Sequence, residues 1–241
     1  MSRWKGAEQL GFYEEELVPI IKRVCPIIEK TEHMKDILNG TMSIEHFRFQ
    51  IKQNYHYLMD YTRCWAVGFS KCRNFKEMEE WYSIVKNTME GTVMFNRDFW
   101  AKQINVSLEE LDAVIEAQGK RSYTSFQLMC AQQGGLAEIM MALFPCNILY
   151  RFFAEDLLDS CTLPHDNMYY QWLKYYVSES YVEKTENEIR MVNKLCEGKT
   201  KEERTRLVEI FATSCNYEIL QWQDMYHNMT TWPLDDIFPK K

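Results

Sequence analysis

The segment Leu143–Tyr150 places a cysteine directly after a proline inside a long apolar stretch. Proline has no N–H to donate to the carbonyl four residues back, so Pro145 should break or kink the helix that this stretch forms. Cys146 would then lie near the free amide N–H groups at the start of the next helix, where a thiolate is stabilised. The pattern indicates either a nucleophile or a buried structural cysteine beside a helix kink.

Glu218 lies between Tyr217 and Trp222 in a segment with helical, apolar periodicity. Burial disfavours the charged form of a carboxyl group, so we expect a raised pKa for Glu218 and proton delivery near neutral pH. A surface glutamate at the edge of the apolar stripe is the alternative interpretation.

A third set of candidate residues combines an amide side chain with several phenols. Asn54 and Tyr57 are three residues apart and so share a helix face, which Tyr61 extends. A planar amide beside phenol rings can hold a flat, nitrogen-bearing ring, although tyrosine packing around a core amide gives the same pattern. Tyr123 and Tyr176 add further phenols. Paired Glu and His ligands for a dimetal site are not evident, so we expect no metal.

These residues must be positioned by helices, because apolar residues recur with a helical period throughout the chain and no segment alternates with a period of two. The 241 residues include only 9 Gly and 6 Pro, few for a protein of short strands and turns. We expect one all-α domain over residues 1–241, a bundle of about eight helices, with residues 229–241 as an irregular strap. The predicted helical segments are residues 7–30, 43–70, 76–103, 107–119, 122–144, 145–160, 164–180, 181–196 and 201–229. Ser43 should cap the second of these, and Ser107-Leu-Glu-Glu should start the fourth with a capping box.

Composition excludes several classes of function. A net charge of −7 argues against nucleic acid or an anionic membrane as a partner. The longest apolar stretch, Ile139–Phe153, is interrupted by Pro145, Asn147 and Arg151, so we expect it not to span a membrane. The N-terminus has no apolar signal-peptide core, and the eight cysteines are scattered without CxxC spacing. A reducing, cytoplasmic location is therefore expected.

Together these segments resemble the TenA family, the thiaminase II enzymes, over nearly the whole chain. The most specific similarities are at residues 143–150, at 217–222, in Gln-x-x-x-Tyr-Leu at 53–58, and in Ser-Tyr-Thr-Ser at 122–125. The resemblance implies a heme-oxygenase-like all-α fold and a homo-oligomer, usually a tetramer. It also implies a cofactor-free hydrolase that cleaves the bond between a 4-aminopyrimidine methylene carbon and its amine leaving group. The substrate would be thiamin or aminomethyl-aminopyrimidine.

The resemblance assigns a role to each matching residue. Cys146 corresponds to the cysteine that adds to the pyrimidine ring, and Glu218 to the carboxylate that protonates a ring nitrogen. Tyr57, Tyr123 and Tyr176 correspond to the tyrosines that hold the ring and orient the thiol.

Two further substrate-binding positions depart from the family pattern. Asn54 stands where the family usually has an aspartate, and Gln221 where it usually has a phenylalanine. An asparagine can pair with the aminopyrimidine edge as it pairs with adenine. It lacks the negative charge that favours a cationic ring, and we expect this to lower the rate of the reaction roughly 10²- to 10³-fold. The alternatives are a hydrolase or lyase for another nitrogen heterocycle, and a non-catalytic pyrimidine-binding or regulatory protein.

Overall fold

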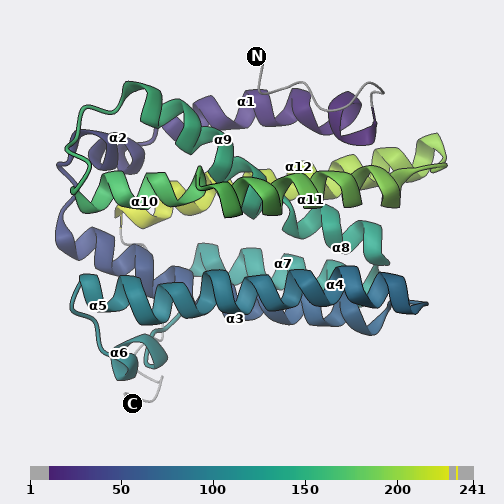
Figure 1. Cartoon of the computed structure of the whole chain (residues 1–241), viewed down its shortest axis with the longest axis horizontal. Helices are drawn as coiled ribbons and strands as arrows, with labels where there is room; N and C mark the ends of the chain where they lie inside the picture. The colour runs from purple at the N-terminus through teal and green to yellow at the C-terminus, as the bar shows by residue number, and fades with distance from the viewer. Residues whose placement is uncertain (1–10, 228–231, 233–241) are drawn as a thin grey trace. The chain divides into compact units, whose positions relative to one another are not determined.

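The computed structural model describes residues 11–227 and Trp232, and within them all regular secondary structure is helical (Figure 1). The all-α prediction is therefore confirmed. These residues divide into two compact units: unit 1 comprises residues 11–42 and 140–222, and unit 2 comprises residues 43–139, 223–227 and Trp232. A single domain stays a prediction. Residues 7–10 of the predicted first helix and the predicted strap at 229–241, Trp232 excepted, lie outside the described residues.

Unit 2 is organised around its longest helix, α3, against which α4 and α7 pack (Figure 1). The α3–α4 contact depends on a glycine, because a Cβ atom on Gly68 would lie 2.1 Å from the Trp81 ring. Between α4 and α5 the chain stays helical through two π-helical turns, η2 and η3, in agreement with the helix predicted at residues 76–103. The elements of this unit are α3 (Ile44–Ser70), α4 (Phe75–Thr88), η2 (Met89–Val93), η3 (Asn96–Trp100), α5 (Ala101–Gln103), α6 (Leu108–Asp112) and α7 (Gln118–Gln133).

The helix predicted at 107–119 is shorter than expected. Its capping box forms as predicted, with Ser107 and Glu110 exchanging side-chain and backbone hydrogen bonds. Helix α6 nevertheless ends at Asp112, because Gln53 of α3 takes over the backbone groups that follow. The Gln53 amide donates to the Ile115 carbonyl at 3.0 Å and accepts from the Ala117 N–H at 2.8 Å. A partner from another helix thus replaces the helical hydrogen bonds of this segment.

The helix predicted at 122–144 is also interrupted, at Gly134. Helix α7 ends at Gln133, and α8 (Leu136–Leu143) begins after the glycine pair. The Lys71 ammonium donates to the carbonyls of Ala131 and Gly134, each at 2.6 Å, and so satisfies oxygens that the end of α7 exposes.

Unit 1 is organised around α9, with α1, α10 and α11 packed against it. The prediction also missed a short helix, α2, whose N-cap Thr31 accepts from the N–H of Met34 at 3.3 Å. The elements of unit 1 are η1 (Tyr13–Leu17), α1 (Val18–Glu29), α2 (Glu32–Asn39), α9 (Pro145–Ser160), α10 (Met168–Tyr176) and α11 (Glu179–Cys196). The boundary between the units falls within α8 and within α12 (Lys201–His227).

The stretch Leu136–Ser160 is, among the described residues, long and apolar enough to cross a membrane, with a mean hydropathy of 1.3. In the structure it is divided between α8 and α9, and 89% of its apolar window is buried. Core helices of globular proteins have the same composition.

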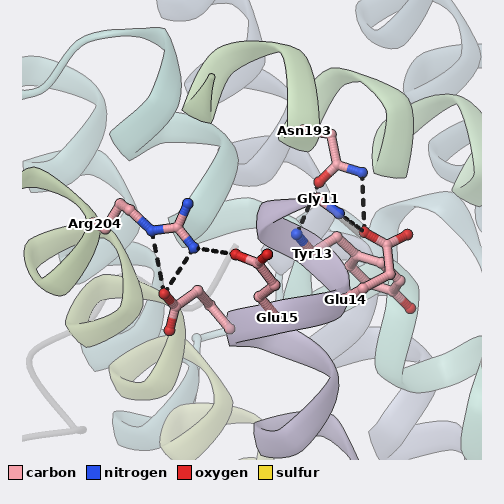
Figure 2. Close-up of polar contacts among 7 residues, drawn as sticks. Gly11, Tyr13, Glu14, Glu15, Asn193 and Arg204 are labelled. Atoms are coloured by element: carbon pink, nitrogen blue, oxygen red, sulfur yellow. Dashed lines mark hydrogen bonds and ion pairs between the residues drawn. The ribbon is translucent and has the colours of Figure 1, made fainter. Parts of the chain in front are cut away.

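Residues of η1 form hydrogen bonds and ion pairs with α11 and α12 (Figure 2). The Tyr13 N–H donates to the Asn193 side-chain oxygen of α11 at 2.8 Å. Arg204 of α12 pairs with Glu15 at 2.7 Å and with Glu16 at 2.8 Å. Residues about 180 positions apart are thereby joined.

A buried polar network joins α9 to α11. The Asn147 amide donates to Glu188 at 2.8 Å, and one helical turn later Arg151 donates to Thr185 at 2.9 Å and to Glu186 at 2.6 Å. Glu188 is only 1% exposed. Burial raises the pKa of its carboxyl group to about 7, although Lys184 and the Asn147 hydrogen bond act in the opposite direction.

We expect Glu188→Gln to stabilise the protein at high pH. A carboxyl group whose pKa rises from 4.5 to about 7 on folding stabilises the native state below about pH 4.5, and this contribution disappears as the pH rises through 7. The loss corresponds to about 3 kcal/mol, which a neutral glutamine does not incur. Denaturant unfolding of wild type and variant at pH 5 and pH 8.5 measures the difference.

The control is Glu183→Gln, because Glu183 is exposed on the same helix. Equal pH dependence of unfolding in wild type and Glu188→Gln would contradict a neutral buried acid at this position.

Candidate functional site

The structure places Cys146 at the second residue of α9, directly after a helix break. Helix α8 ends at Leu143 and α9 begins at Pro145, as predicted. The carbonyl of Ala142, in the last turn of α8, accepts a hydrogen bond from the Ser214 hydroxyl at 2.7 Å. The Cys146 side chain is buried, with 8% exposed.

Two tyrosines lie close to this thiol. Tyr150 is four residues after Cys146 on α9, so the two share a face, and its ring centroid is 4.9 Å from that of Tyr176. Burial raises the pKa of the Tyr150 hydroxyl well above its usual value, and the negative charges of Glu218 and then Cys146 raise it further. The same two charges, after burial and Tyr175, raise the pKa of Tyr176. Both phenols therefore remain neutral hydrogen-bond donors at physiological pH.

Glu218 is fully buried in α12, so the alternative of a surface glutamate is wrong. The Gln221 side chain, three residues on, donates its amide N–H to Glu218 Oε2. Gln221 is itself buried, and the next residue, Trp222, packs with its ring centroid 5.5 Å from that of Tyr150. Gln221, one of the two residues that depart from the family pattern, is thus hydrogen-bonded to Glu218, the predicted proton donor.

A third tyrosine completes this group. The Tyr181 ring centroid lies 5.2 Å from that of Tyr176, and the charge of Cys146 is among the causes, after burial and Tyr176, of the raised pKa of Tyr181. Unit 1 therefore brings together six buried residues, which we call the Cys146 cluster: Cys146, Tyr150, Tyr176, Tyr181, Glu218 and Gln221.

Two members of the Cys146 cluster, Tyr150 and Tyr181, are not among the residues predicted from the sequence. The four-residue spacing from Cys146 to Tyr150 was a signal that could have identified Tyr150. No comparable local signal identifies Tyr181, which belongs to another helix.

Unit 2 holds the other predicted tyrosines. The Tyr57 ring stacks with Tyr61 at 5.6 Å and with Tyr123 at 5.4 Å between centroids. The Tyr57 hydroxyl accepts from the Gln127 amide at 2.9 Å. The Lys120 ammonium, which is not among the predicted site residues, lies 4.4 Å from the Tyr57 ring centroid. We call these five residues the Tyr57 cluster.

Asn54 is half-buried on α3 and is directed to a different partner. Its amide nitrogen lies 3.5 Å from the Asn96 side-chain oxygen, the outer limit of a hydrogen bond. Asn96 in turn donates to the Thr92 carbonyl at 2.9 Å. The structure thus pairs Asn54 with η3, whereas Tyr57 packs with residues of α7.

Within the described part of the chain, no three His, Cys, Asp or Glu side chains lie close enough together to hold a metal ion. The groups available for chemistry in the Cys146 cluster are a thiol, a carboxyl group and three phenols. A thiol and a carboxyl group that both act on Tyr150 and Tyr176 offer a nucleophile and a proton donor around the same phenols, the two groups that covalent catalysis with acid assistance uses.

Comparison with known proteins gives consistent matches. The aminopyrimidine aminohydrolase of Halalkalibacterium halodurans is 30% identical over 83% of this chain and 88% of its own length. The solved structure of a TenA homologue from P. horikoshii OT3 has a TM-score of 0.80 and 23% sequence identity, and the match covers 90% of this chain and 99% of that one.

The fold match extends to a more distant structure. A domain of unknown function with a heme oxygenase-like fold from Shewanella denitrificans OS217 has a TM-score of 0.69 at 13% identity, and covers 88% of this chain and 90% of its own. The predicted heme-oxygenase-like fold is therefore confirmed. Residues 22–228 match the TENA/THI-4/PQQC family as a whole. The chain belongs to the TENA/THI-4/PQQC family.

Proposed function

We propose that the protein is an aminopyrimidine aminohydrolase of the thiaminase II type, acting in thiamin salvage. Its substrate would be thiamin or aminomethyl-aminopyrimidine, and it would need no cofactor. The observation that carries the proposal is the Cys146 cluster, in which Cys146 and Glu218 are buried around the same tyrosines. A relative named for this activity, at 30% identity over most of both chains, supports it.

The proposed reaction uses Cys146 as the nucleophile and Glu218 as the acid. The thiolate adds to the pyrimidine ring as Glu218 gives its proton to a ring nitrogen, and the ring loses aromaticity. The exocyclic C–N bond then breaks and the nitrogen leaves with the bonding electron pair: the thiazole of thiamin leaves neutral, whereas the amine of aminomethyl-aminopyrimidine takes up a proton and leaves as ammonia. Water adds at the methylene carbon, and elimination of the cysteine restores the ring and yields a hydroxymethylpyrimidine.

Gln221 acts in this scheme through Glu218. Its hydrogen bond to Glu218 Oε2 favours a role in orienting the carboxyl group over the substrate contact expected from the resemblance. The roles of Tyr57, Tyr123 and Tyr176 in holding the ring stay as the resemblance implies.

The test is turnover by the purified protein. Thiamin, aminomethyl-aminopyrimidine and a panel of other ring amines are each incubated with the protein, and the alcohol product is measured by liquid chromatography with mass spectrometry. Hydroxymethylpyrimidine from the first two supports the proposal. Turnover restricted to another ring amine supports a hydrolase for a different heterocycle, and tight binding of a pyrimidine without turnover supports a binding or regulatory protein.

We expect Asn54→Asp to raise the rate on 4-aminopyrimidines. The carboxylate would accept from the amino group and stabilise positive charge on the ring during addition. Because Asn54 now donates to the Asn96 oxygen, which would face the new carboxylate, we expect a gain of about tenfold and not the full 10²–10³. Steady-state kinetics of both proteins measures the gain.

The opposite result is informative for the alternative function. If the protein is adapted to another heterocycle, Asn54→Asp removes an amide donor and lowers the rate on that substrate, at a cost of about 1–3 kcal/mol. A rate on aminopyrimidines that does not change would show that Asn54 takes no part in binding the ring.

We further propose a cytoplasmic homo-oligomer, a tetramer as the resemblance implies. Size-exclusion chromatography with light scattering measures the mass, and a 28.9 kDa particle would contradict the oligomer.

A further inference from the structure

Asn147, the residue directly after Cys146, is held by one face of α11. Its amide nitrogen donates to Glu188 Oε1 at 2.8 Å, and its side-chain oxygen accepts from the Lys184 ammonium at 3.0 Å. The Tyr181 hydroxyl donates to the main-chain carbonyl of Asn147 at 3.3 Å. Residues 181, 184 and 188 are spaced by three and four positions, so they lie on the same side of α11.

These contacts are buried. Asn147, Tyr181 and Glu188 each have no more than 5% of their surface exposed. A buried polar group without a partner is costly, and buried hydrogen bonds therefore restrict the residues that make them to one arrangement. Glu188 Oε2 has no hydrogen-bond partner within residues 11–227, which favours the neutral carboxyl group. A neutral carboxyl group still accepts the Asn147 N–H at Oε1.

The thiol depends on this arrangement through the backbone. Cys146 and Asn147 are consecutive residues in the first turn of α9, so a shift of Asn147 moves the Cys146 Cα atom with it. Tyr181 links the two directly, since its hydroxyl contacts Asn147 and its ring belongs to the Cys146 cluster.

We propose that Glu188, acting through Asn147, and Tyr181 are positioning residues that hold the Cys146 thiol in place for addition to the substrate. The inference rests on the proposed function, because it assumes Cys146 to be the nucleophile. Neither Glu188 nor Asn147 touches the substrate in this scheme. Their effect is on where the first turn of α9, and with it the thiol, is located.

The experiment compares Glu188→Leu, which removes the acceptor, with Glu188→Gln, which keeps an oxygen for the Asn147 N–H. The matched control is Glu183→Leu, the same change at an exposed position of α11. Two quantities are measured in each protein: the rate of Cys146 alkylation by iodoacetamide without substrate, followed by peptide mass spectrometry, and kcat and KM for the aminopyrimidine.

We expect Glu188→Leu to slow Cys146 alkylation and to lower kcat, each by about 10- to 100-fold, because small displacements of a reacting group cost this much. KM should change by less than about twofold, since binding contacts are unaltered. Glu188→Gln should retain both rates within about threefold, because the hydrogen bond that orients Asn147 is kept. Glu183→Leu should match wild type.

Tyr181→Phe is the second variant, since it keeps the ring and removes only the hydroxyl that bonds the Asn147 carbonyl. Like Glu188→Leu, it should slow the alkylation of Cys146. If circular dichroism shows that Glu188→Leu does not fold, Tyr181→Phe alone provides the test. Unchanged alkylation in the folded variants would overturn the inference, as would an equal loss in Glu188→Gln and Glu188→Leu. Alkylation that responds to Glu188 in a protein without turnover would leave the positioning intact and reject the proposed function alone.

Discussion

Replacing Cys146 with serine is expected to lower kcat roughly 10⁴-fold or more, because the attacking thiolate is replaced by a hydroxyl group that stays protonated. Substrate binding should persist, since the phenols that hold the ring are unaltered and serine is close to cysteine in volume. Steady-state kinetics gives the loss of kcat, and isothermal titration with the aminopyrimidine gives the retained affinity. Full activity of Cys146→Ser would rule out covalent catalysis.

The control for this change is Cys72→Ser, which alters a half-exposed cysteine beyond the end of α3. A second check is the relative reactivity of the thiols. Burial raises the pKa of Cys64 to about 12 and the pKa of Cys215 well above its usual value, with Glu218 adding to the latter. We therefore expect Cys146 to alkylate faster than either at neutral pH.

The second large effect concerns the proton donor. Glu218→Gln should lower kcat about 10²- to 10⁴-fold, the usual contribution of a positioned acid, because an amide cannot protonate the ring nitrogen. Since glutamine has the shape of glutamate, KM should change little. Stopped-time product assays over a range of substrate concentrations separate the two constants.

Glu209→Gln is the matched control, because Glu209 is exposed on the same helix, α12. Activity of Glu218→Gln close to wild type would assign the proton transfer to another group. Gln221→Met, which removes the hydrogen bond to Glu218 but keeps the length of the side chain, should give an intermediate loss of about tenfold.

Features that depend on neighbouring residues could be predicted from the sequence. The Ser43 cap, the capping box of Ser107 and Glu110, and the break at Pro145 each involve residues within about four positions, and all three form. Cys146 was identified in the same way. The position of a catalytic candidate at a helix start is a local property of the chain.

Features that depend on distant partners could not be predicted. Helix α6 stops early because Gln53, more than 60 residues away in sequence, binds the backbone that follows it. The burial of Glu218 likewise depends on helices other than its own, so its sequence pattern left both interpretations open. Asn147 and Glu188 are 41 positions apart, and neither has a sequence context that distinguishes it from an ordinary helix residue.

The bond between Tyr13 and Asn193 has a consequence for synthesis on the ribosome. Translation at about 5–20 residues per second separates the emergence of these two residues by roughly 10–35 seconds. For most of that interval the apolar face of α1, with Ile21 and Ile28 fully buried in the finished protein, has no completed α9 to cover it. Residues 43–139 are complete in the meantime. We therefore expect nascent chains arrested near residue 139 to recruit chaperones through their first helix, and release from them to coincide with the appearance of α9.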